Sequence, residues 1–201
     1  MPRYRITYEK RDSACFVPHI VLPTVFARAA GRASHSENGD CELEPIIFQM
    51  TEGFSPHAKM SFASELPVGV VALKEPVDMW LINILSDSQF ESWSKSLPKG
   101  FKLISFFEVP EGSPSISKSC HISEYLLKVR SADKVEPVKN ILLDLAENMT
   151  VSSGNEGEFF RFAVDNHAVT LGVIVKKLIS ENAVEGWHEL CIVRVRVGGV
   201  E

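Results

Sequence analysis

A histidine and a lysine stand two residues apart in the segment GFSPHAK, which runs from Gly53 to Lys59. Gly53 permits unusual backbone angles and Pro56 stiffens the chain, so we expect a turn that projects its side chains. His57 supplies a titratable ring and Lys59 a cation, while Phe54 supplies an aromatic surface. Cations beside aromatic rings are typical of sites that contact the phosphates and bases of RNA. The alternative is a tight hairpin in which the histidine bonds to the backbone and the phenylalanines fill the core.

His19 is a second candidate for chemistry, because it lies just before a helix that we predict from about Val21 to Ala33. The start of a helix favours anions through its free N–H groups and its dipole. If His19 and His57 share one pocket, they are candidate catalytic residues for general acid–base cleavage of RNA without a metal. The alternative is a histidine that only caps the helix.

Positive charge gathers near the N-terminus, although the formal net charge of the 201 residues is −5. Arg3 and Arg5 lie on a predicted first strand, and Arg28 and Arg32 lie on the predicted first helix. An acidic chain is a poor non-specific binder of nucleic acid, but a local basic face could hold RNA. The alternative is that these arginines only solvate the surface of a strand and a helix.

Motifs for metals and cofactors are absent from the sequence. It has no HExxH and no CxxC pair for a metal, and no GxGxxG or Walker A loop for a nucleotide. The four cysteines, Cys15, Cys41, Cys120 and Cys191, lie far apart, as is typical of reduced thiols in a cytoplasm. No apolar run approaches the ~20 residues that a membrane-spanning helix needs. We therefore expect a cytoplasmic protein with no cofactor, no metal and no membrane contact.

Composition and periodicity predict two successive α+β units. With 45% hydrophobic and 23% charged residues, the chain has a globular composition, which excludes a disordered tail or a fibre. The order β-α-β-β-α-β is predicted over residues 1–109, followed by a linker rich in proline and serine over 110–122 and the same order again over 123–201. This pattern predicts two tandem ferredoxin-like subdomains, each a split β-α-β unit with an antiparallel sheet. Within the first, an apolar stripe predicts the buried face of the first helix, formed by Val25, Phe26, Ala29 and Ala30. Ser88 and Glu91 predict a capping box for the second helix.

The segment GFSPHAKMSFASELPVG, residues 53–69, resembles the signature of the uncharacterised radical-SAM-linked proteins, in which a spaced glutamate and aspartate follow. Glu75 and Asp78 stand in those two places. The resemblance extends upstream over residues 16–33, where His19 matches the family histidine. Val21 departs from the family, which usually has an aspartate there, and the resemblance fades after about Val109.

The resemblance implies an accessory role, because such proteins occur beside or fused to a radical-SAM protein. This chain lacks the CxxxCxxC motif of the radical enzyme itself. The leading hypothesis is therefore an accessory module that binds RNA or a radical-SAM partner protein. The proposed binding residues are Arg3, Arg5, His19, Arg28, Arg32, Gly53, Phe54, His57 and Lys59. One alternative is a metal-independent enzyme that cleaves or modifies RNA with His19 and His57, and another is a pure protein–protein adaptor.

Overall fold

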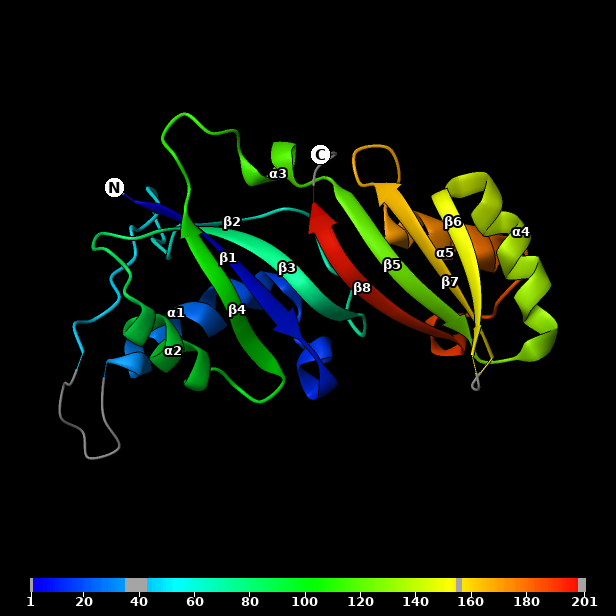
Figure 1. The fold of residues 1–201 in the computed structure, drawn as a ribbon, viewed down its shortest axis with the longest axis horizontal. Coiled ribbons are helices and arrows are strands. Elements are labelled where there is room, and N and C mark those ends of the chain that lie inside the picture. The colour runs from blue at the N-terminus through cyan, green and yellow to red at the C-terminus, as the bar shows by residue number, and fades with distance from the viewer. Residues whose placement is uncertain (1, 35–42, 155–156, 199–201) are drawn as a thin grey trace.

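The computed structural model describes residues 2–34, 43–154 and 157–198 (Figure 1). Cys41 and most of the polar stretch between the first helix and Pro45 lie outside these residues. None of the helices in the described ranges is long and apolar enough to cross a membrane.

The strands of the first half form part of a sheet, and the first of them alternates between a buried and a more exposed face. In β1 (Arg3–Lys10), Tyr4, Ile6 and Tyr8 are buried while the residues between them are partly exposed, as its two-residue period predicts. The other elements of this half are α1 (Leu22–Ala33), β2 (Met60–Phe62), β3 (Val71–Trp80), α2 (Asp87–Lys95) and β4 (Phe101–Glu108). Short 3-10 turns at Asp12–Phe16 and His19–Val21 connect β1 to α1.

The second half repeats this alternation of strands and helices. After a short helix α3 (Ile116–Ser119), its elements are β5 (Ile122–Val129), α4 (Val135–Leu145), β6 (Glu147–Gly154), β7 (Gly157–Asp165), α5 (Leu171–Ser180) and β8 (Leu190–Gly198). Further 3-10 turns occur at Ala132–Lys134 and Trp187–Glu189. The chain is therefore an α+β protein, as the sequence predicts.

All strands belong to one mixed sheet of eight strands, with the order β4-β1-β3-β8-β5-β7-β6 and β2 paired to β3 (Figure 1). The prediction of separate antiparallel sheets is wrong at the join, where β3 and β8 pair in parallel through Val71↔Val193 and Ala72↔Arg194. The cause is the length of β3: the three residues of β2 pair only with its final part, Val77 to Met79, so the edge near its start is left for β8.

Each half has its own hydrophobic core on the same side of the sheet. Tyr4, Ile6 and Tyr8 pack with residues of α1 and α2, while Tyr125 and Leu127 pack with residues of α4 and α5. We call the side that bears these five residues the helix face and the other side the outer face. Side chains that alternate with them, such as those next to Tyr4 and Tyr125 in sequence, point to the outer face.

The segment between β2 and β3 belongs to the first half in sequence but packs against the second half. Leu66 and Val70 are each 1% exposed and pack in the core of the second half, although they precede β3 in sequence. The stretch that resembles the family signature therefore crosses from one core to the other.

Candidate functional site

The residues Thr51 to His57 form a closed turn that holds Phe54 in solvent. The N–H of Thr51 donates to the carbonyl of His57 (2.8 Å), and the N–H of His57 donates to the Thr51 hydroxyl (3.2 Å). Gly53 has a φ of +132°, which favours glycine. Phe54 is 106% exposed, so it does not fill the core. The imidazole Nδ1 of the exposed His57 lies 3.1 Å from the Thr51 hydroxyl and 3.3 Å from the carbonyl of Ser55. The histidine thus contacts the backbone as the hairpin alternative expects, whereas Phe54 does not pack in the core as that alternative expects.

Lys59 lies on the outer face beside Trp80. Its Nζ is 5.0 Å from the centroid of the indole, a cation–π contact. Trp80 follows the buried Met79 in β3 and pairs with Arg3 of β1, which places both on the outer face. Lys59 is therefore a surface cation held by an aromatic ring.

Arg3 and Arg5 are committed to contacts within the chain. Arg5 binds both carboxylate oxygens of Asp78 (2.7 and 3.0 Å), and the side chain of Asp78 is fully buried. This hydrogen-bonded pair raises the pKa of the Arg5 guanidinium. Arg5 also donates to the hydroxyl of Ser119 (3.2 Å), and Arg3 donates to the carbonyl of Ser113 (3.1 Å). Through Ser113 and Ser119, these two arginines hold the linker between β4 and β5 on the outer face of the sheet. They are therefore not free cations.

The basic helix and the loop do not form the continuous surface that the sequence analysis proposes. Phe26 of α1 packs against Tyr8, so α1 covers the helix face, whereas Lys59 lies on the outer face. Arg28 is exposed, and Arg32 donates to the carbonyl of Ser96 at the end of α2 (2.8 Å). The sheet therefore separates the α1 arginines from Lys59.

His19 lies in the 3-10 turn that leads into α1, far from His57. Its ring packs edge-on against Phe62, with ring centroids 4.6 Å apart. The chain from His57 to Phe62 runs extended into β2, and five residues of strand span roughly 16 Å. The structure does not bring the two imidazoles into one pocket, so the general acid–base pair has no geometric support. His19 Nδ1 is buried and has no hydrogen-bond partner among the described residues.

We expect His19 to make the protein acid-sensitive. Burial lowers the pKa of this histidine, partly opposed by the carboxylate of Glu65. Above about pH 6.5 the imidazole is neutral in both the folded and unfolded states, but below it the unfolded chain takes up the proton more readily. The free energy of unfolding should fall as the pH is lowered from about 7 past about 6.5, and His19→Phe should lose less of it. Urea melts across this range test this, and a decline in His19→Phe as steep as in His57→Phe would contradict it.

A buried ion pair joins the two halves, and of its two residues the sequence analysis named only Glu75. Arg194 of β8 is fully buried, and its Nε donates to a carboxylate oxygen of Glu75 in β3 (2.6 Å). Its Nη1 donates to the Ser64 hydroxyl (2.9 Å) and to the carbonyl of Glu65 (3.2 Å). Glu75, the place that the family resemblance marks, thus has a structural role at the join. Arg194 gave no signal in the sequence other than a charge inside an apolar strand.

A cavity of about 490 Å³ lies beside this join, between the segment around Glu65 and the start of α5. The rings of His121 and His167 stack there, 4.9 Å apart and 7° from parallel. Each histidine has one ring nitrogen near a backbone carbonyl, His121 Nδ1 near that of Lys118 and His167 Nε2 near that of Ser117, both at 3.2 Å. No sequence pattern marks this pair, because 45 residues lie between the two histidines.

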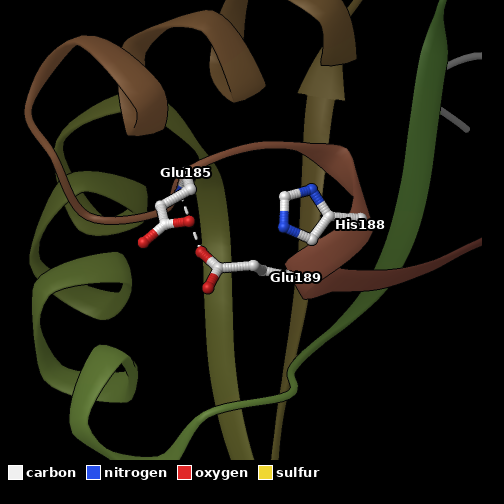
Figure 2. Close-up of side chains that lie close together, drawn as sticks. All are labelled: Glu185, His188 and Glu189. Carbon is white, nitrogen blue, oxygen red and sulfur yellow. Dashed lines mark hydrogen bonds between the residues drawn. The ribbon is translucent and has the colours of Figure 1, made fainter.

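Glu185, His188 and Glu189 gather around one point in the turn before β8 (Figure 2). Lys134 already occupies this cluster, with its Nζ 2.7 and 2.8 Å from the two oxygens of Glu189. The N–H of Glu185 also donates to Glu189 (2.7 Å). The Lys134 ammonium and the Glu185 amide both donate to the Glu189 carboxylate, which a metal ion would need as a ligand. These contacts explain why the cluster forms.

A family model described as "Uncharacterized protein conserved in bacteria (DUF2344)" matches residues 3–171. The chain belongs to this family. The match covers the whole first half and continues into the second half as far as the start of α5. No curated protein sequence matches the chain.

Solved structures that align with this chain differ widely from it in sequence. One is an unknown protein from Galdieria sulphuraria, with 12% identity, a TM-score of 0.28 and coverage of 100% of this chain and 99% of that chain. Another is the small subunit of acetolactate synthase from Thermotoga maritima, with 10% identity, a TM-score of 0.28 and coverage of 96% and 94%. Similarity at this level supports no inference about function.

Proposed function

We propose that this DUF2344 protein is an accessory protein that binds a partner protein through the end of its sheet. The observation that carries the proposal is Phe54, a large aromatic side chain held wholly in solvent by a well-bonded turn. Other large apolar side chains are exposed on neighbouring segments. We call this set the loop patch, and its members are Ile47, Met50, Phe54, Ile82 and Ile84.

The segments that carry the loop patch lie side by side. The N–H of Ile82 donates to the carbonyl of Ile47 (2.8 Å), and Met50 forms a bridge with Ala58 at the base of the turn. Exposed apolar side chains on segments that adjoin in this way are found at protein interaction sites, and aromatic residues contribute most to binding at such sites.

Charge favours a protein over RNA as the partner. Binding to RNA depends on free cations that neutralise phosphates. Asp78 neutralises Arg5 and lies 3.9 Å from Arg3, and the exposed Glu52 stands two residues from Phe54. Lys59 is the cation nearest the turn in sequence. One lysine supplies too little positive charge to bind a phosphate backbone.

The resemblance of residues 53–69 to radical-SAM-linked proteins supports a radical-SAM protein as the partner. The patch lies within the segments 47–54 and 82–84, which adjoin or overlap the signature in the fold. Because the CxxxCxxC motif is absent from this chain, the partner would carry the cluster chemistry.

We also infer that the chain consists of two tandem ferredoxin-like units joined edge to edge, with the connection at residues 110–122. The strand orders support this, since β4-β1-β3-β2 and β8-β5-β7-β6 both follow the order fourth, first, third, second within their halves. A cytoplasmic location is supported by the described cysteines, Cys15, Cys120 and Cys191, which are all free thiols.

The test is the affinity for the radical-SAM protein encoded nearest to this chain in the same genome. Phe54→Ala should weaken binding by at least ~10-fold, because a central aromatic residue is lost. Phe16→Ala is the matched control, since Phe16 is also exposed (69%) but lies before α1, and it should change binding by less than ~2-fold. Salt-dependent binding to RNA with no affinity for the protein would contradict the proposal in favour of the RNA hypothesis.

A further inference from the structure

Two arginines share one carboxylate on the outer face of the second half. Glu124 of β5 accepts a hydrogen bond from Nε of Arg196 on β8 (2.8 Å) and another from Nε of Arg161 on β7. The strand register explains why the three side chains lie together. Glu124 pairs directly with Arg196, and Arg161 is opposite the residue two positions further along β5. Glu124 therefore fixes both guanidinium groups from between them.

Both arginines keep their terminal nitrogens available. Within the described ranges, each arginine bonds to Glu124 through Nε, and no partner contacts its Nη atoms. The side chains of Arg161 and Arg196 are 55% and 69% exposed, whereas that of Glu124 is 15% exposed. The guanidinium groups are thus held at one edge and open to a ligand at the other.

The two arginines line a cavity of about 400 Å³. Its walls include the apolar Ile122 and Ala163 and the hydroxyl-bearing Thr150, which pairs with Arg161 across β6 and β7. A volume of this size falls in the range of small-molecule sites.

The charge in the cavity is positive. The hydrogen bond from Arg161, and after it that from Arg196, lowers the pKa of Glu124, so this carboxylate is ionised at neutral pH. Two guanidinium groups and one carboxylate leave one net positive charge, and no other ionisable side chain among the described residues lines the cavity.

We propose that this cavity binds the phosphate group of a small phosphate monoester through the Nη atoms of Arg161 and Arg196. Planar guanidinium groups donate pairs of hydrogen bonds that match phosphate oxygens. Two guanidinium groups together suit a doubly charged phosphate better than they suit a ligand with a single carboxylate. Ile122 and Ala163 offer apolar surface to the organic part of the ligand. The site lies on the second half and is independent of the loop patch.

The test is calorimetric titration of the full chain with ribose 5-phosphate at constant ionic strength. We expect saturable binding, weakened at least ~10-fold by Arg161→Gln and by Arg196→Gln, because each loses charged hydrogen bonds. Arg130→Gln is the matched control: it removes the same charge from an exposed arginine outside the cavity and should leave the affinity within ~2-fold. All substituted residues are exposed, so thermal melts should show folded variants.

Three results would overturn the proposal. An equal loss in Arg130→Gln would mean diffuse charge attraction, and acetate binding as tightly as ribose 5-phosphate would mean a carboxylate site. Binding of an RNA oligonucleotide without binding of ribose 5-phosphate or inorganic phosphate would mean contact with a nucleic-acid backbone.

Discussion

Glu75→Ala is expected to lower the free energy of unfolding by about 3–5 kcal/mol, because it leaves the charge of Arg194 buried without its partner. Arg194 is fully buried at the join of β3 and β8, and both of its bonds to Glu75 cross between the halves. Ser64 and the carbonyl of Glu65 remain as acceptors but carry no full charge. Urea denaturation followed by tryptophan fluorescence measures the loss.

A double variant separates the buried charge from other effects of the substitution. Glu75→Ala combined with Arg194→Met should be more stable than Glu75→Ala alone, because no unpaired charge remains in the interior. Glu91→Ala, an exposed glutamate on α2, is the matched control and should change stability by less than about 0.5 kcal/mol. A loss in Glu75→Ala no greater than this would refute the structural role of the pair.

Leu66→Ala is expected to lower the free energy of unfolding by about 2–5 kcal/mol, because it opens a cavity in the core of the second half. Leu66 itself belongs to the first half of the chain. Leu66 is 1% exposed, while Leu143 on α4 is 55% exposed and provides the control substitution. Leu143→Ala should cost less than about 1 kcal/mol. Thermal or urea melts of the two variants test this, and equal midpoints would show that the crossing segment does not stabilise the second core.

Local patterns predicted β1, β4 and both helices of the first half, because each of these elements depends on neighbours in sequence. Phe26, Ala29 and Ala30 are buried on α1 as their helical spacing predicts. The capping box of α2 is present, but Ser86 and Gln89 form it, two residues before the predicted Ser88 and Glu91. Both pairs have the same spacing, so the pattern alone does not select the residue where the helix begins.

Contacts between residues far apart in the chain leave no local pattern in the sequence. Arg194 and Glu75 lie 119 residues apart, and nothing in either segment indicates that β3 and β8 pair in parallel. The same limit applies to Arg5, which looked like a free cation because its partner Asp78 is 73 residues away.

The proposed site could be predicted only as far as the loop itself. Phe54 and His57 lie on an exposed turn, which Gly53 and Pro56 favour. Joining that turn to Arg28 and Arg32 failed because the face on which each side chain lies depends on the assembled sheet. Ile82 and Ile84 were missed because they belong to a different segment, brought beside Ile47 by backbone pairing.

Hydrogen exchange of the backbone amides, with and without the radical-SAM protein, tests the central claim most directly. If the loop patch binds that partner, exchange should slow at residues 47–58 and 82–84, while the exposed side of α1 around Arg28 and Arg32 keeps its rate. Slowing confined to α1, or no change at the turn that carries Phe54 when the complex is fully formed, would contradict the account.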